Sequence, residues 1–237
     1  MKNYRKELLQ NGFAILRQTY SDNEIKQIIS AIENIDINKK TVRKSADLFA
    51  IRQFLKDNET IRHLIFTKNF KSVVEKIAGD DFFVVKSIYF DKPPTSNWYV
   101  PYHQDLTISV DKKIETQKFK NWTTKQNQFA VQPPVELLEN IITLRIHLDK
   151  TDENNGALRV IPKSHLKEIY PPQTIDWNKE KQVICDVEKG GVMLMKPLLL
   201  HSSKRTTNKK QRRVIHIELS NQELPLDLNW SEKMTIE

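Results

Sequence analysis

The sequence lacks several features that would each define a class of protein. It contains a single cysteine, Cys185, which excludes an internal disulfide framework and a cysteine-rich zinc site. No apolar stretch approaches the ~20 residues that a transmembrane helix requires, and the first residues lack the apolar core of a signal peptide. There is no internal repeat and no low-complexity tract. We therefore expect a cytoplasmic protein without a membrane partner.

The composition is typical of a globular protein. The 237 residues are 38% hydrophobic and 29% charged, which is enough to bury a sizeable core, and we predict one domain over residues 1–237. The formal net charge is +8, but the 38 basic residues are interspersed with 30 acidic ones and form no long block. An anionic substrate or cosubstrate explains this excess as well as a nucleic acid would, so we expect no nucleic-acid partner.

Helical patterns dominate the N-terminal part of the chain. Residues 11–16 predict a first strand, after which Ser21-Asp22-Asn23-Glu24 has the form of a capping box that begins a helix. Residues 39–45 are polar and basic, and we expect a mobile loop there. From Leu48 to Gly79 the apolar positions again follow a helical period, with Gly79 as the expected end of the helix.

Short strands are predicted after residue 81, because the sequence becomes rich in β-branched and aromatic residues. Residues 107–135 form a long polar interruption, which we interpret as a lid. Helices followed by many short strands predict an α+β protein. We expect a helical part at about 20–79, packed against a jelly-roll core at about 82–219. The predicted strands of that core are 82–90, 141–148, 157–162, 183–187, 191–195 and 214–219.

A histidine and an aspartate stand one residue apart in the segment 102–106, Tyr-His-Gln-Asp-Leu. On a strand, positions i and i+2 point to the same side, so His103 and Asp105 would face one interior together. The best candidate for a third ligand is His201, which follows an apolar run of leucines. Two imidazoles and one carboxylate form the ligand set of non-haem Fe(II) oxygenases. The competing interpretation is a hydrogen-bonded surface pair of His103 and Asp105.

A second polar face is predicted in the segment 141–148. Its alternation places Thr143, Arg145 and His147 on one face and aliphatic side chains on the other. Because a central strand is covered on both faces, these polar side chains imply a polar cavity.

Four segments stand in the order and spacing of a known family. They are Lys92-Pro93-Pro94, His103-Gln104-Asp105, residues 154–165 (Asn-Asn-Gly-Ala-Leu-Arg-Val-Ile-Pro-Lys-Ser-His), and His201 followed eleven residues later by Arg212. From Gly12 to Leu219 the chain resembles the phytanoyl-CoA dioxygenase family. The resemblance implies a double-stranded β-helix (a cupin-like jelly roll), with Fe(II) and 2-oxoglutarate as cofactors. It also implies that dioxygen hydroxylates an unactivated carbon of a small-molecule substrate, with release of succinate and CO2.

The resemblance further implies the roles of individual residues. His103, Asp105 and His201 correspond to the iron ligands, and Arg212 to the arginine that binds the distal carboxylate of 2-oxoglutarate. A guanidinium offers that carboxylate a rigid pair of donors. Strand alternation turns the neighbouring Arg213 to the opposite face, where we expect solvent. Related halogenases have a small residue at the position of Asp105, so its presence favours hydroxylation.

Four more residues are expected near the cosubstrate. Gln104 and Ser203 match family positions that contact it. Arg145 stands where the family often has an aromatic wall, so it could bind a carboxylate of the cosubstrate or of the substrate, or form a structural ion pair. Thr143 shares the predicted polar face of Arg145 and is grouped with it.

Two other functions remain open from the sequence. A catalytically inactive jelly-roll binding module with a basic surface would explain the net charge, although it would have no use for the ligand set. A cupin-type enzyme with a different ligand set is a third alternative, but the chain has no close His-x-His pair followed by Glu. The sequence identifies neither the substrate nor the oligomeric state.

Overall fold

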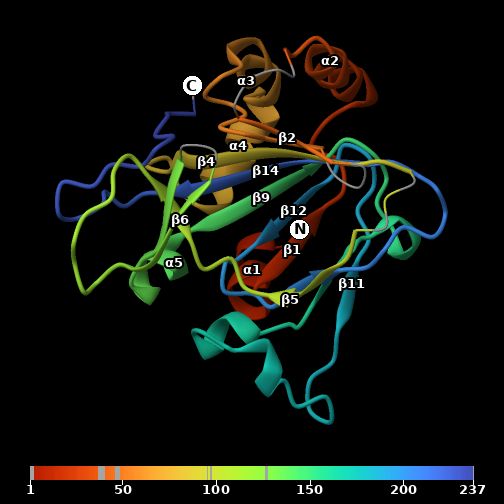
Figure 1. Cartoon of the computed structure of the whole chain (residues 1–237). Helices are drawn as coiled ribbons and strands as arrows, with labels where there is room; N and C mark the ends of the chain where they lie inside the picture. The colour runs from red at the N-terminus through yellow and green to blue at the C-terminus, as the bar shows by residue number, and fades with distance from the viewer. Residues whose placement is uncertain are drawn as a thin grey trace.

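The structure, a computed structural model, describes residues 3–36, 41–45, 49–94, 96, 98–125 and 128–236. Within these ranges no helix is long and apolar enough to cross a membrane. The helices α2, α3 and α4 lie together over one side of a large sheet, and a smaller sheet lies on its other side (Figure 1). The α-helices are α1 (Tyr4–Asn11), α2 (Asp22–Glu33), α3 (Glu59–Ile65), α4 (Lys68–Ile77) and α5 (Val135–Asn140). The described residues also form the short 3-10 helices η1 (Glu153–Asn155), η2 (Ser164–Lys167) and η3 (Pro172–Thr174).

Two antiparallel sheets form the jelly roll. The larger has the order β1-β12-β9-β14-β4-β3-β2, and the smaller has the order β11-β10-β13-β5. The larger sheet comprises β1 (Phe13–Leu16), β12 (Val192–Met195), β9 (Ile142–His147), β14 (Arg212–Ser220), β4 (Phe83–Lys92), β3 (Phe49–Arg52) and β2 (Val42–Lys44). The smaller comprises β11 (Val183–Cys185), β10 (Leu158–Val160), β13 (His201–Ser203) and β5 (Val100–His103). The predicted fold class, an α+β protein with a jelly-roll core and N-terminal helices packed against it, is confirmed.

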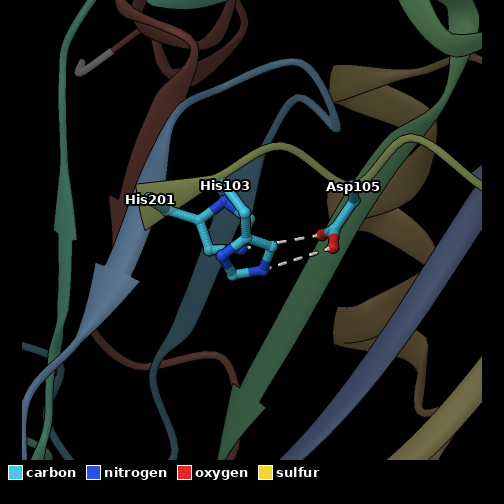
Figure 2. A group of neighbouring side chains, drawn as sticks. All are labelled: His103, Asp105 and His201. Atoms are coloured by element: carbon cyan, nitrogen blue, oxygen red, sulfur yellow. Dashed lines mark ion pairs between the residues drawn. The ribbon is translucent and has the colours of Figure 1, made fainter. Parts of the chain in front are cut away.

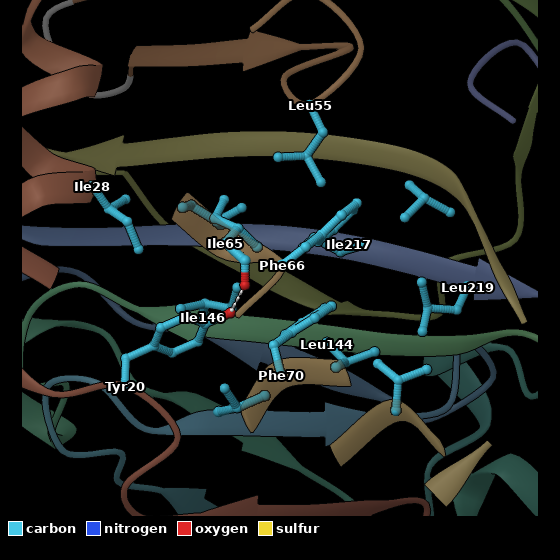
Figure 3. Close-up of a cluster of buried hydrophobic side chains, with 14 of the residues drawn as sticks. Tyr20, Ile28, Leu55, Ile65, Phe66, Phe70, Leu144, Ile146, Ile217 and Leu219 are labelled. Atoms are coloured by element: carbon cyan, nitrogen blue, oxygen red, sulfur yellow. Dashed lines mark hydrogen bonds between the residues drawn. The ribbon is translucent and has the colours of Figure 1, made fainter. Parts of the chain in front are cut away.

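The main hydrophobic core lies between the helices and the outer face of the larger sheet (Figure 3). Leu144 and Ile146 of β9 and Ile217 of β14 point toward the helices, where Phe66 and Phe70 stack with ring centroids 5.6 Å apart. Burying each such side chain contributes about 1.5–3 kcal/mol to stability. The apolar side of β9 is therefore the side that the helices cover.

The helix starts follow from local capping. Ser21 Oγ accepts a hydrogen bond from Glu24 N, and Glu24 Oε2 accepts one from Ser21 N at 2.7 Å, so the predicted capping box is present. Thr67 caps α4 in the same way by accepting from Phe70 N.

The prediction of helix from Leu48 to Gly79 is wrong in its first part. Residues 49–52 form β3, which pairs with β4 and buries Ile51. Helix begins only at Glu59, after a turn. Leu48 and residues 39 and 40 of the predicted loop lie outside the described residues, while Val42–Lys44 form the edge strand β2 instead of a loop.

The segment 107–135 is not the long loop on which its interpretation as a lid was based, and closure of the segment over the site stays a prediction. It contains a third antiparallel sheet of β6 (Ile108–Val110), β8 (Gln128–Gln132) and β7 (Lys120–Lys125). Its apolar side chains pack with residues from the C-terminal part of the chain, in a cluster that includes Ile108, Val110, Phe119, Val131 and Trp230. The segment is therefore a packed element of the fold.

Candidate metal centre

Two imidazoles meet at the end of the smaller sheet. His201 on β13 lies directly opposite His103 on β5, because these strands pair antiparallel in that register. Directly opposed residues in such a pair point to the same face, and the two ring centroids are 4.2 Å apart. The pairing explains how residues distant in sequence come together, as Figure 2 shows.

Asp105 joins the histidines from just beyond β5, which corrects the prediction that it would lie on the same strand as His103. The chain leaves the strand there, and Asp105 N donates to Pro197 O at 2.9 Å. The carboxylate oxygens then lie 3.9 Å from His103 Nε2 and 3.8 Å from His201 Nε2. The three potential ligand atoms all lie within 4.8 Å of one another.

Both histidines present the same nitrogen to this cluster. His103 Nδ1 bonds Pro101 O and His201 Nδ1 bonds Leu199 O, each at 2.9 Å. A carbonyl oxygen can only accept, so each Nδ1 carries a proton and each Nε2 keeps its lone pair. This arrangement, a ligand imidazole fixed by a backbone carbonyl, is usual at metal sites.

The protonation states also suit a cation. Burial lowers the pKa of His201 to about 4, against the opposing charge of Asp105. Burial raises the pKa of Asp105, but the positive charge that His201, His216, His103 and Lys86 can carry outweighs it and holds that pKa well below its ordinary value. Near neutral pH the cluster therefore offers a neutral His201 and an ionised Asp105. Two nitrogens and one carboxylate fit a first-row divalent metal such as Fe(II).

The cluster opens into a cavity of about 200 Å³ between the two sheets, which is lined by two arginines as well. Arg212, the first residue of β14, is buried, and its Nη1 donates to Gly156 O at 2.6 Å. Ser203 Oγ donates to the same carbonyl at 3.0 Å. Gly156 has φ of +88°, a backbone conformation that favours glycine, and a Cβ there would lie 3.0 Å from both Lys204 O and Lys92 Nζ.

Arg145 of β9 is the second buried arginine of the cavity. Its Nη1 bonds His216 Nδ1 at 3.1 Å, and its Nε has no partner, as is also true of Arg212 Nε. Burial and, to a smaller extent, the charge of Arg145 lower the pKa of Arg212 to about 9. Burial likewise lowers the pKa of Arg145 to about 10, against the charge of Asp105. Among the described residues, no carboxylate lies within ion-pair distance of either guanidinium. Two buried cations with unused donors fit a dianion such as 2-oxoglutarate.

Two of the residues predicted near the cosubstrate, Gln104 and Thr143, do not line the cavity. The prediction for Gln104 is not supported, because its amide donates to Glu168 O and Leu198 O and accepts from Tyr170 N, away from the cavity. Thr143 is fully buried beside the cavity wall, and its Oγ1 has no partner. His147 bonds Thr151 Oγ1 at 2.8 Å and is not part of the cavity lining.

Arg213 does turn to the opposite face from Arg212, but it does not lie in solvent. Its Nη2 and Nε bind Asp149 at 2.8 and 2.9 Å. The prediction that this arginine would be solvated is therefore wrong.

The sequence interpretation missed a charged part of the cavity wall formed by Lys86, His216 and Glu218, whose side chains all line the cavity. Lys86 and His216 lie on the predicted strands 82–90 and 214–219, whereas no role was predicted for Glu218. Strand alternation along residues 212–218 could have predicted that His216 and Glu218 face the cavity. If Arg212 points inward, positions 214, 216 and 218 point inward too.

The fold and the cluster define a class: a double-stranded β-helix that carries two histidines and a carboxylate at one end of the smaller sheet. The sequence model described as Phytanoyl-CoA dioxygenase (PhyH) matches residues 8–214. The chain belongs to this family.

Named relatives and solved structures are similar to the chain at low identity. Peroxisomal phytanoyl-CoA dioxygenase of Bos taurus is 23% identical over 246 residues, covering 89% of this chain and 66% of the relative, and that of Homo sapiens is 23% identical with 65% covered. The chain thus spans slightly less than two thirds of the length of these relatives. The structure of SnoK, a non-heme alpha ketoglutarate dependent carbocyclase from nogalamycin biosynthesis, superposes with a TM-score of 0.70 at 14% identity, covering 98% of this chain and 87% of that one. EctD from S. alaskensis, with 2-oxoglutarate and 5-hydroxyectoine, gives 0.69 at 16% identity, covering 93% and 76%. At these identities the structures show a shared fold.

Proposed function

We propose that the protein is an Fe(II)- and 2-oxoglutarate-dependent dioxygenase that hydroxylates an unactivated carbon of a small molecule. The observation that carries the proposal is one cavity that joins the cluster of His103, Asp105 and His201 to two buried arginines with unused donors. Membership of the phytanoyl-CoA dioxygenase family supports it.

In this proposal the three clustered side chains hold the metal. Bound iron supplies the oxidation of a substrate C–H bond by dioxygen, while 2-oxoglutarate is converted to succinate and CO2. The protein keeps the ligand nitrogens free of protons, because the carbonyls of Pro101 and Leu199 hold the protons on Nδ1.

Arg212 would bind the distal carboxylate of 2-oxoglutarate. Its bond to Gly156 O fixes the guanidinium at Nη1, so Nε and Nη2 remain for a carboxylate in a paired arrangement. Ser203 shares the same anchor and lies beside this position. Water would be excluded by the apolar side chains of the cavity, which include Ile88, Trp98 and Leu158.

The substrate is proposed only as a class. Solved structures that share the fold include a carbocyclase of nogalamycin biosynthesis and a complex with 5-hydroxyectoine, both of which concern small molecules. The net charge of +8 favours an anionic substrate. The single-domain organisation over 1–237 and the cytoplasmic location remain predictions.

Anaerobic addition of Fe(II) and 2-oxoglutarate tests the function. We expect one iron per chain and the weak visible charge-transfer band of a 2-oxoglutarate chelate. His201→Ala should remove both, because the metal loses a ligand from the most buried side of the cluster. A folded His201→Ala variant that binds iron and gives the band like the parent would show that the cluster is not the metal site.

Arg212 separates the enzyme from a basic binding module. Losing a buried charged partner costs about 2–5 kcal/mol, which is tens- to thousands-fold in affinity for 2-oxoglutarate, so Arg212→Ala should weaken binding by that factor. The exposed Lys210 is the matched control, and Lys210→Ala should change affinity by less than ~1 kcal/mol. A binding module would lose affinity for a polyanion equally at both positions and steeply with salt.

A further inference from the structure

Three neighbouring strands present a continuous polar wall to the cavity. In the register of β4, β14 and β9, Glu218 lies opposite Lys86 on one side and Thr143 on the other, and His216 lies opposite Arg145. Side chains directly opposite each other in adjacent antiparallel strands share a face. The wall is therefore set by strand register rather than by a loop.

The wall is held by a directed chain of hydrogen bonds. Lys86 Nζ binds Glu218 Oε1 at 2.9 Å, His216 Nε2 binds the same oxygen at 3.0 Å, and Arg145 Nη1 reaches His216 Nδ1 at 3.1 Å. A guanidinium only donates, so Nδ1 is the acceptor and Nε2 carries the proton that is donated to Glu218. The chain fixes Arg145 through Nη1 alone and leaves Nε and Nη2 for another partner.

Arg145 lines the same cavity as the metal cluster and Arg212 and lies close to both. Asp105 is the carboxylate whose charge acts most on Arg145, and Arg145 in turn acts on both His201 and Arg212. Its side chain is only 7% exposed, so it lies in the depth of the cavity and not at the mouth through which a substrate enters. A molecule that reaches from Arg212 to the metal cluster therefore shares this cavity with Arg145.

A buried guanidinium without a carboxylate is costly, and Arg145 has only a neutral imidazole as partner. A ligand that spans this path and carries a negative charge at each end supplies the missing partner for both arginines. 2-Oxoglutarate has such a structure, with one carboxylate beside its keto group and the other at the far end.

We propose that Arg145 binds the 1-carboxylate of 2-oxoglutarate, the one beside the keto group, while Arg212 binds the 5-carboxylate, and that His216 and Glu218 are positioning residues for Arg145. The inference rests on the proposed function. Arg145 stands where the family often has an aromatic wall and makes a charged contact instead, so each carboxylate of the cosubstrate binds its own guanidinium.

The test compares two ligands that differ at one end. 2-Oxovalerate has the same 2-oxo acid group and chain length as 2-oxoglutarate but a methyl group in place of the 5-carboxylate. Their dissociation constants are measured by calorimetry on the Fe(II)-loaded protein without dioxygen. Arg145→Gln should raise both constants by the same factor, tenfold or more, and leave their ratio unchanged. Arg212→Gln should raise only the dissociation constant for 2-oxoglutarate, so the ratio of the 2-oxovalerate constant to the 2-oxoglutarate constant falls toward one.

Several outcomes would overturn the inference. If Arg145→Gln leaves both constants within twofold of the parent, Arg145 does not bind the cosubstrate. If it weakens 2-oxoglutarate alone, Arg145 shares the 5-carboxylate with Arg212 and the assignment is wrong. If the parent protein binds neither ligand, the proposed function itself fails, which is a separate result.

Controls exclude a merely structural effect. Arg159 is a matched control, since it is buried outside the cavity and pairs with Glu153, so Arg159→Gln should leave both constants unchanged. Arg145→Met removes a buried charge that has no carboxylate partner, so the melting temperature of the ligand-free protein should not fall while binding of both ligands weakens. A lower melting temperature with unchanged constants would assign Arg145 a structural role. If Arg145→Gln does not fold, Arg145→Lys gives the same comparison.

The positioning chain is tested by Glu218→Gln. The glutamine amide keeps an oxygen that accepts from His216 Nε2 but lacks the charge that orients His216. Both dissociation constants should therefore rise by the same factor, which is smaller than the factor for Arg145→Gln. A change in the ratio of the two constants, or no change in either, would contradict the positioning role.

Discussion

The two faces of β9 differ completely although both are buried. Ile142, Leu144 and Ile146 point to the helices and form the main core. Thr143, Arg145 and His147 point into the space between the sheets. The apolar side chains on the helix-covered face need only packing contacts. On the other face, Thr143 Oγ1, Arg145 Nε and His147 Nε2 are buried without a hydrogen-bond partner.

The two faces of β9 therefore have different roles, since one stabilises the fold and the other borders the candidate site. The outer face supplies apolar burial, while the inner face carries buried polar atoms that reduce stability until a ligand satisfies them. Buried polar groups without a partner mark a candidate ligand site, and of Thr143, Arg145 and His147 it is Arg145 that lines the cavity. Mutations on the two faces should therefore change different measured quantities.

The largest effect is expected on the outer side. Phe70 of α4 is fully buried and stacks on Phe66. Phe70→Ala should lower the free energy of unfolding by about 3–5 kcal/mol, because it removes apolar burial and leaves a cavity. Denaturant titration measures this, and Phe70→Leu should cost less. Where Phe70→Ala is still folded, its affinity for 2-oxoglutarate should stay within twofold of the parent. A loss of affinity without a loss of stability would contradict the separation of the two faces.

The second prediction concerns Glu232, the polar exception on the helix-covered side. Its Oε2 accepts a hydrogen bond from Ser87 Oγ at 2.5 Å, and its Oε1 is buried without a partner. Burial raises the pKa of Glu232 from 4.5 to about 7. The folded protein thus keeps a proton that the unfolded chain releases between these values, so this stabilisation is full below pH 4.5 and is lost as the pH rises through about 7.

The expected size of this loss is about 3 kcal/mol, since one pKa unit corresponds to 1.36 kcal/mol. Glu232→Gln cannot ionise and should be more stable than the parent at pH 8 but not at pH 4.5. Melting temperatures of both proteins at the two pH values measure the difference. Parallel pH profiles for parent and variant would show that Glu232 ionises freely in the fold.

The smallest effect is expected at Thr143 on the inner face. Thr143→Val keeps the shape and removes a buried hydroxyl that has no partner, so stability should stay equal or rise by up to ~1 kcal/mol. Thermal melts of the ligand-free protein measure this change. A loss above 1 kcal/mol would show that the hydroxyl is bonded in the native state.

The sequence predicts these two faces because strand alternation is local. Thr143, Arg145 and Leu144 could be assigned to opposite sides from the segment 141–148 alone. The pairing of His103 with His201 could only be expected through ligand chemistry, because it depends on the register of two distant strands.

Three features were not accessible in this way. Asp105 leaves the strand because its N–H bonds Pro197 O, a contact with a distant segment. The segment 107–135 is polar enough to resemble a loop, and it folds because residues such as Trp230 cover its few apolar side chains. The chain from Lys86 to Arg145 requires the register of three strands at once.

The position of β14 has a consequence for how the chain acquires its structure. It is the last labelled strand in chain order, yet it lies in the middle of the larger sheet, between β9 and β4. During synthesis, β4 and β9 are made long before the strand that joins them, and both keep open edges until residue 220 is available. Pairings of such high sequence separation form slowly, and open strand edges invite association with other chains. Since Arg212, His216 and Glu218 lie on this same strand, the step that completes the sheet also completes the cavity. A nascent chain stalled before Arg212 would lack both, so we expect it to be captured by chaperones or degraded.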